Sequence, residues 1–257
     1  MTHAQRLFTM KVEQPVPILP MEPFTVKRVI LPAVLILSVL LVSSGILLAT
    51  AAAPGHKLGR TKALPKGVGP KVAGLIDKAG YQVTSPKGPV CSVWLVKDVP
   101  VRDKFKPTLS IKYPFIAGQL VGLLQVHDKN GYTDFRGQEL KPGVYTLRYG
   151  QQPEDGNHVG TSELADFLLA LPAKIDQDPK PIFGFEDLSM KSAKSAGAIH
   201  PAIFSMLPSE KPIKTASVTH DEDHDFWILN VAAAATSKSK KATKVNLRFI
   251  VVGRTPE

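Results

Sequence analysis

The sequence predicts an all-β domain, an antiparallel and jelly-roll-like β-sandwich, preceded by an apolar N-terminal helix that is an export signal or a membrane anchor. Segments rich in β-branched and aromatic residues recur roughly every 10–25 residues between Gly, Pro and Asp turns. The helical crossovers of a parallel α/β sheet are missing from this pattern. The 22 prolines and 19 glycines also suit short strands joined by many turns.

An uncharged apolar run covers residues 29–48, directly after Lys27 and Arg28. Its length is about what a bilayer core requires, roughly 20 residues. Small residues follow, and cleavage after Ala51 fits the signal-peptidase pattern. Two alternatives stay open: a cleaved signal peptide with a periplasmic product, or an anchor in the cytoplasmic membrane with the domain on the periplasmic side. Both Met1 and Met21 remain possible starts.

A basic flank after the apolar run argues for the opposite orientation. Residues 56–71 carry five Lys or Arg and no acid, which the positive-inside rule would place in the cytoplasm. Lys27 and Arg28 lie closer to the run and belong to the signal pattern, so export is the prediction. The expected organisation is a tail with signal or anchor over 1–51, a basic Gly/Pro linker over 52–71, and a β-sandwich domain over 72–257.

The expected elements of the domain start with a short helix over 71–79 that ends at Gly80. Residues 143–149 alternate polar and apolar side chains, which indicates a half-buried strand. A short helix or loop is expected over 185–197, and a flexible lysine-rich loop over 236–244. Strands are predicted over 81–84, 90–96, 110–113, 119–126, 143–149, 166–171, 200–207, 225–233 and 245–253.

Charge and cysteine content narrow the function classes. The net charge is +10, of which residues 1–51 contribute +2, so the exported part favours an anionic envelope polymer, an acidic protein or lipid head groups. Nucleic acid is not expected, because no basic patch is interleaved with aromatic residues. The single cysteine, Cys91, cannot form an internal disulfide and lies in a strand-like run, where it is expected to be a buried hydrophobe.

Four short segments between residues 133 and 171 resemble a known group of sequences. The segments are DFRGQ (134–138) and GVYTLRY (143–149), followed by DGNHVG (155–160) and DF (166–167). They are similar to an uncharacterised family of exported proteins from planctomycete- and acidobacterium-like bacteria. The resemblance covers about 40 residues and implies an envelope location and a β-sandwich, without an activity.

The densest polar cluster is THDEDHD, residues 219–225. His220 and His224 lie four apart, on one face of a helix or strand, and nearby carboxylates could complete a Zn²⁺ or Cu²⁺ site. His158 or His200 could supply a further ligand. The competing interpretation is a solvated acidic turn before the strand that contains Trp227.

The loop 153–160 holds His158 after an Asp155-Gly156 turn signal. Its histidine could bind a ligand or metal, or could simply hydrogen-bond to the loop backbone. Both tryptophans, Trp94 and Trp227, lie in apolar runs and are expected in the core.

No nucleophile elbow, HExxH, P-loop or dinucleotide fingerprint is present in the sequence. The sequence therefore predicts no enzyme and no catalytic residue. It predicts a non-enzymatic binding or structural module of the envelope, and as the alternative a periplasmic zinc- or copper-binding protein.

Overall fold

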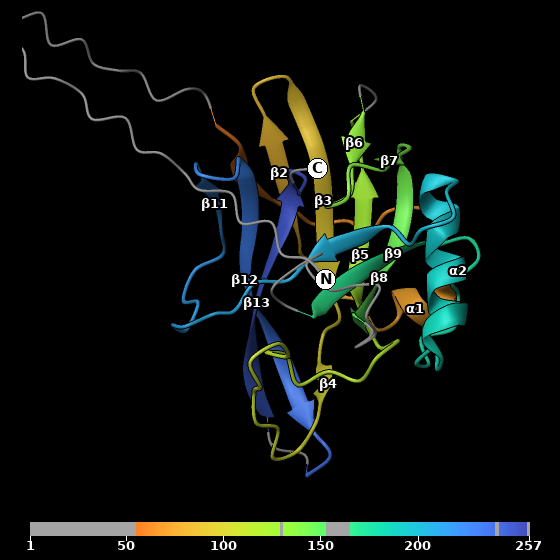
Figure 1. Cartoon of the computed structure of the whole chain (residues 1–257), viewed down its shortest axis with the longest axis vertical. Coiled ribbons are helices and arrows are strands. Elements are labelled where there is room, and N and C mark those ends of the chain that lie inside the picture. The colour runs from red at the N-terminus through yellow and green to blue at the C-terminus, as the bar shows by residue number, and fades with distance from the viewer. Residues whose placement is uncertain (1–54, 129–130, 153–164, 240–241, 256–257) are drawn as a thin grey trace, which may run out of the picture. The chain divides into compact units, whose positions relative to one another are not determined.

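A seven-stranded antiparallel sheet forms the larger layer of this computed structural model, which describes residues 55–128, 131–152, 165–239 and 242–255 (Figure 1). The described residues belong to one unit of the chain, Thr50–Glu257. The strands lie in the order β1 (Lys57–Thr61), β2 (Gly80–Ser85), β3 (Gly88–Leu95), β5 (Leu120–Val126), β8 (Gly143–Gln151), β9 (Asp166–Pro172) and β10 (Ile203–Ser205).

The second sheet is built around a long antiparallel hairpin. Its strands are β11 (Ser217–Asp221), β12 (Phe226–Ser237) and β13 (Ala242–Val252), and β4 (Val99–Val101) pairs with β12 in parallel. A bridge between Met206 and Phe249 connects the β10 edge of the first sheet to β13. A small separate ladder joins β6 (Tyr132–Thr133) to β7 (Glu139–Leu140). The predicted β-rich, mainly antiparallel class is therefore confirmed.

The inner faces of both sheets contribute to one hydrophobic core. Leu123 and Leu147 of the first sheet are in the same buried cluster as Val231 and Phe249 of the second. Alternation along each strand produces this, because successive side chains point to opposite faces. Trp94 is in this core, as predicted. Cys91 is free and buried there, and burial raises the pKa of its thiol to about 12, so it behaves as a hydrophobe.

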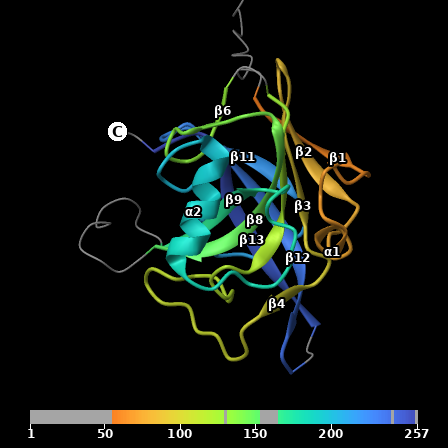
Figure 2. The same ribbon diagram turned by 90° about the vertical axis from the view of Figure 1, so that its right-hand side faces the viewer.

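The outer face of β9 and β10 is covered by helix α2 (Phe185–Ala196), seen in front of β8 and β9 in Figure 2. The helix ends at Gly197, whose φ of 64° is the left-handed conformation that terminates many helices. On its buried side, the Ser192 and Ser195 hydroxyls both donate to the Ala170 carbonyl at 2.8 Å. The other helix, α1 (Pro70–Ala73), is much shorter than the 71–79 prediction.

Two other segments differ from the sequence prediction. Residues 110–113 form no strand, because the Lys112 amide donates to Asp166 Oδ2 at 2.6 Å and the Tyr113 hydroxyl donates to the Leu207 carbonyl at 2.6 Å. Part of the segment predicted as a linker is β1, which pairs with β2 over five residues. These contacts join distant parts of the chain, which a local pattern does not reveal.

The predicted N-terminal helix lies outside the described residues. Within the described part of the chain, no helix is long and apolar enough to cross a membrane. The predicted 153–160 loop also lies outside the described ranges.

Candidate functional site

A groove forms where β4 runs beside the far end of the β12–β13 hairpin. Ala235–Ser237 pair with Val99–Val101 in parallel, and this places the loop after β4 next to the end of the hairpin. Ala233 and Ala235 are buried on β12, and their small side chains let the two segments pack closely. The groove is thus built from two segments about 135 residues apart in the chain.

The loop after β4 is held in place by its first residues. The Arg102 amide donates to the Pro114 carbonyl at 2.8 Å, and the Arg102 guanidinium lies 4.5 Å from the centre of the Phe105 ring. The Gln119 side chain, which is buried, donates to the Pro100 carbonyl at 2.8 Å. The loop therefore has a defined position beside the hairpin.

The groove consists of two adjoining hollows of about 680 and 640 Å³. They share Val101, Arg102, Asp103 and Ser237 in their walls, so they form one continuous surface feature. Each volume lies in the range of small-molecule sites, and the two adjoining hollows together give room for a longer ligand.

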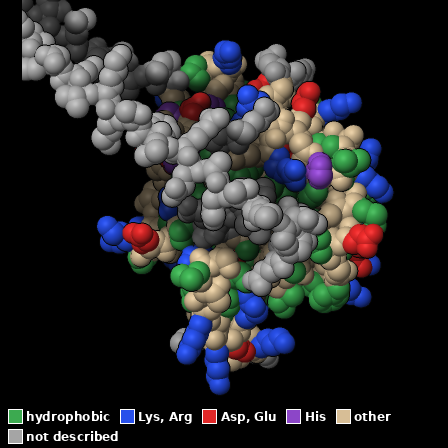
Figure 3. Space-filling view, in the orientation of Figure 1, with side chains coloured by type: hydrophobic (Ala, Val, Ile, Leu, Met, Phe, Trp, Pro, Cys, Tyr) green, Lys and Arg blue, Asp and Glu red, His purple; other side chains and the backbone are tan. Residues whose placement is uncertain are grey.

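Four cations line this groove: Arg102, Lys104, Lys238 and Lys244. All four are exposed, and none forms an ion pair with another residue in the described ranges. Lysine and arginine side chains gather at this end of the molecule in Figure 3. Because only two acids, Asp98 and Asp103, line the groove beside these four cations, its described walls carry a net positive charge that would attract an anion.

The two acids of the groove are bound by hydroxyl groups instead of cations. The Thr236 hydroxyl donates to Asp98 Oδ1 at 2.7 Å, and the Ser239 hydroxyl donates to Asp103 Oδ1 at 3.2 Å. Ser237 and Thr243 add further hydroxyls to the walls. The surface thus combines exposed cations with hydroxyl groups.

The histidine cluster predicted to bind metal is split between two partners. His220 Nε2 hydrogen-bonds to Asp225 Oδ1 at 2.7 Å, and its ring stacks on Trp227 with centroids 4.2 Å apart. His224 Nδ1 instead contacts Asp221 Oδ2 at 3.2 Å. The two histidines therefore pair with two different carboxylates at the β11–β12 turn.

Trp227 is half-buried on this surface and is not in the main core, contrary to the prediction. His56 lies 4.5 Å from its ring, and burial there lowers the pKa of His56. A Cβ on Gly55 would lie 2.5 Å from the Trp227 ring, so glycine is needed for this close approach. The segment 55–56 therefore packs on the start of β12.

Of the other two predicted metal ligands, His200 does not join the pair, because it lines a different cavity beneath α2. His158 is outside the described residues. Across the ranges that the structure describes, no group of three or more His, Cys, Asp or Glu could hold a metal ion. A zinc or copper site at His220 and His224 stays a prediction.

We expect the full-length chain, purified without a histidine tag or chelator, to contain far less than one zinc or copper per molecule. The reason is that no third histidine or cysteine joins His220 and His224 within the described residues, and two such ligands bind these ions weakly. Inductively coupled plasma mass spectrometry measures the content. Near-stoichiometric metal that disappears in a His220→Ala/His224→Ala variant would contradict this expectation and establish the metal site.

Sequence reasoning identified one half of the groove, the lysine-rich segment 236–244, but as a flexible loop. It did not place 98–106 beside it, because strand pairing between such distant segments leaves no local signal. The Pro/Lys-rich composition after residue 97 was the available hint. Comparisons with family models, curated proteins and solved structures found no match for the chain.

Proposed function

We propose that this protein is a non-enzymatic binding module that works outside the cytoplasmic membrane, and that its basic groove binds an anionic polymer of the cell envelope. The observation that carries the proposal is the set of four exposed cations along one groove, none of which forms an ion pair with a described residue. In this proposal the domain is a jelly-roll-like sandwich, and the N-terminal helix is the export signal or membrane anchor of the protein.

An acidic polysaccharide fits the groove better than an acidic protein. Its acid groups would pair with Arg102, Lys104, Lys238 and Lys244, and its hydroxyls would exchange hydrogen bonds with Ser237 and its neighbours. A polymer can also follow two adjoining hollows. The proposed export would place the groove among envelope polymers, which agrees with the same choice.

The position of the groove within the domain is consistent with this function. His56, close to where the described chain begins, contacts Trp227 at the start of β12, while Ser237 lies at the other end of the same strand. Twelve strand residues separate these ends by roughly 40 Å. The groove is therefore at the opposite end of β12 from the point where the N-terminal segment joins the domain.

The full-length chain is expected to bind alginate, a polyuronate, and not neutral dextran. A Lys238→Gln/Lys244→Gln variant should bind alginate about five- to tenfold more weakly, because each exposed cation contributes up to about 1 kcal/mol. The affinity should also fall as salt rises, since these charges face solvent. Isothermal titration calorimetry at two salt concentrations measures both effects.

The matched control is Lys87→Gln/Lys141→Gln, which removes two exposed lysines outside the groove. It should leave the alginate affinity unchanged. An equal loss in both variants would show that only net charge matters and would overturn the groove. Tighter binding to anionic lipid vesicles or to DNA than to alginate would replace the polysaccharide with that class of partner.

The alternative function, which the metal content expected above would rule out, is a zinc- or copper-binding protein built on His220 and His224. The observation in its favour is that both histidines lie on one turn with carboxylates in contact. The metal analysis described above tests it independently of the groove.

A further inference from the structure

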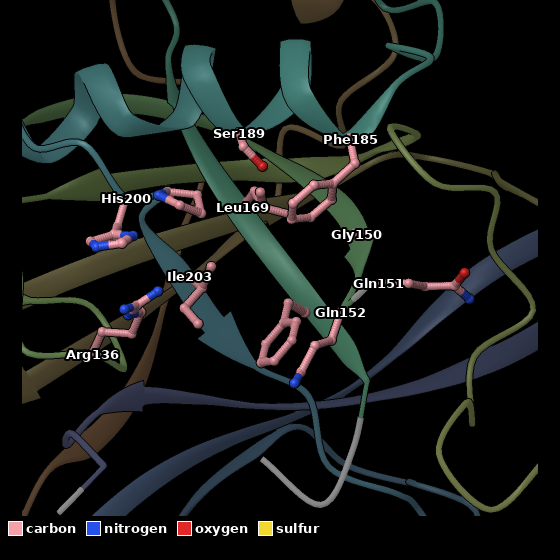
Figure 4. Close-up of a pocket in the computed structure, with 11 residues that line it drawn as sticks. Arg136, Gly150, Gln151, Gln152, Leu169, Phe185, Ser189, His200 and Ile203 are labelled. Carbon is pink, nitrogen blue, oxygen red and sulfur yellow. The ribbon is translucent and has the colours of Figure 1, made fainter. Parts of the chain in front are cut away.

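A cavity of about 170 Å³ lies between α2 and the outer face of β8, β9 and β10 (Figure 4). Its floor is apolar: Phe167, Leu169 and Ile203 line it, and all three are buried. Gly150 belongs to the same floor, and a Cβ there would lie 2.2 Å from Leu169 Cδ1. Glycine therefore lets Leu169 occupy its place in the floor.

Helix α2 contributes the opposite wall. Phe185 and Ser189 are four residues apart, so they lie on one face of the helix, and both line the cavity. Ser189 Oγ is buried and has no hydrogen-bond partner within the described part of the chain. A buried hydroxyl without a partner costs about 1–3 kcal/mol, which a ligand atom could recover.

Arg136 and His200 lie together at one end of the cavity in Figure 4. Both side chains are exposed, and neither makes a hydrogen bond or ion pair with a residue in the described ranges. None of the described residues that line the cavity is an acid. This end therefore offers one permanent cation and one imidazole to an anionic group.

A buried carboxylate positions this end over the floor. Asp134 Oδ1 accepts the amides of Arg136 at 3.0 Å and of Gln138 at 2.7 Å. Its other oxygen, Oδ2, accepts the Ile203 amide at 3.0 Å. The turn that carries Arg136 is thus fixed to the strand that supplies Ile203, so the cation has a defined place relative to the apolar floor.

We propose that this cavity binds a small aryl carboxylate. The ring would lie among Phe167, Phe185 and Ile203, and the carboxylate would contact Arg136 and His200. The size agrees, because an apolar cavity of about 150 Å³ accommodates a benzene ring. Ser189 would hydrogen-bond to a polar ring substituent such as a phenolic hydroxyl. The site is separate from the basic groove and does not depend on its function.

The test is calorimetric titration of the full-length chain with phenylacetate, 4-hydroxyphenylacetate and the uncharged phenylacetamide. We expect both acids to bind and the amide to bind at least about tenfold more weakly, since a charged hydrogen bond is lost. Arg136→Gln should weaken both acids by a similar factor. Ser189→Ala should weaken only the hydroxylated acid.

The matched control is Arg60→Gln, an exposed arginine of β1 whose recorded contact is with the Tyr81 ring. It should leave all three affinities unchanged. Absence of phenylacetate binding up to millimolar concentration would overturn the proposal. So would equal affinity for acid and amide, or an equal loss in Arg136→Gln and Arg60→Gln. Alginate binding in the same samples reports on the groove separately.

Discussion

Replacing Asp176 with alanine is expected to destabilise the domain by about 3–5 kcal/mol, because it leaves the Arg148 guanidinium buried without a counter-ion. Arg148 is 0% exposed and Asp176 6%. The two form a bidentate pair, Nε to Oδ2 at 2.6 Å and Nη2 to Oδ1 at 2.7 Å. The remaining guanidinium hydrogen bonds go to the carbonyls of Gly118, Asp178 and Lys180.

Urea unfolding of both proteins measures the difference in the free energy of unfolding. The matched control is Asp187→Ala, which breaks the exposed Asp187–Lys191 ion pair of α2 and should cost less than about 1 kcal/mol. A loss for Asp176→Ala as small as that of the control would show that water reaches Arg148 and would contradict the buried pair.

A double variant separates the ion pair from the packing around it. Arg148→Met/Asp176→Leu removes both charges and is expected to be more stable than Asp176→Ala. The carbonyl groups of Asp178 and Lys180, which accept hydrogen bonds from Arg148, would then lack a donor. This missing hydrogen bonding would account for the remaining loss of stability. A double variant less stable than the single variant would mean that the segment's position depends on the guanidinium itself.

Replacing Gly118 with alanine is the other change with a large expected effect, about 3 kcal/mol or more. Its φ is +79°, which costs an L-residue about 1–2 kcal/mol. A Cβ there would also lie 1.8 Å from the Ile182 carbonyl oxygen, so main chain must move, with a further overpacking cost of about 1–3 kcal/mol. Thermal and urea unfolding measure the sum.

Gly67→Ala separates the two causes. Its φ is +88°, almost the same, but a Cβ there would meet no atom within 4 Å. This variant should lose only the conformational part, about 1–2 kcal/mol. If both variants lost the same free energy of unfolding, the contact with Ile182 would relax without cost. The larger loss predicted for Gly118→Ala would then be wrong.

The local patterns of the sequence were sufficient for most of the core strands. The runs 81–84, 90–96, 119–126, 143–149, 166–171, 225–233 and 245–253 all correspond to strands in the structure. Their alternation or β-branched content is a property of neighbouring residues, so it can be recognised without the fold. A short helix or loop was expected over 185–197, and the structure has helix α2 there.

The errors occurred where distant contacts override local preference. Residues 110–113 have strand-like composition, yet the Lys112 amide bonds to Asp166 instead of a neighbouring strand. The reverse occurs at β4, whose three residues pair with the end of β12 far along the chain. Trp227 has an apolar setting in sequence but lies half-buried, where His56 and His220 contact it.

The candidate sites show the same division. Residue type and spacing singled out His220 and His224, but only the folded turn shows that they contact different carboxylates. His200 was proposed as a metal ligand, whereas the structure places it with Arg136 at the α2 cavity. Arg136 belongs to the DFRGQ segment, but that resemblance implied no binding site, and no sequence feature marked Ser189.

The sequence by itself determined the β-rich class, the positions of the main strands and the positive charge, because these follow from the periodicity and composition of adjacent residues. The tertiary structure decided which residues share a surface: the four cations beside β4 and β12, and the apolar cavity with Arg136 and His200. The physical reason is that pairing between distant strands brings these groups together, and no local pattern encodes that pairing.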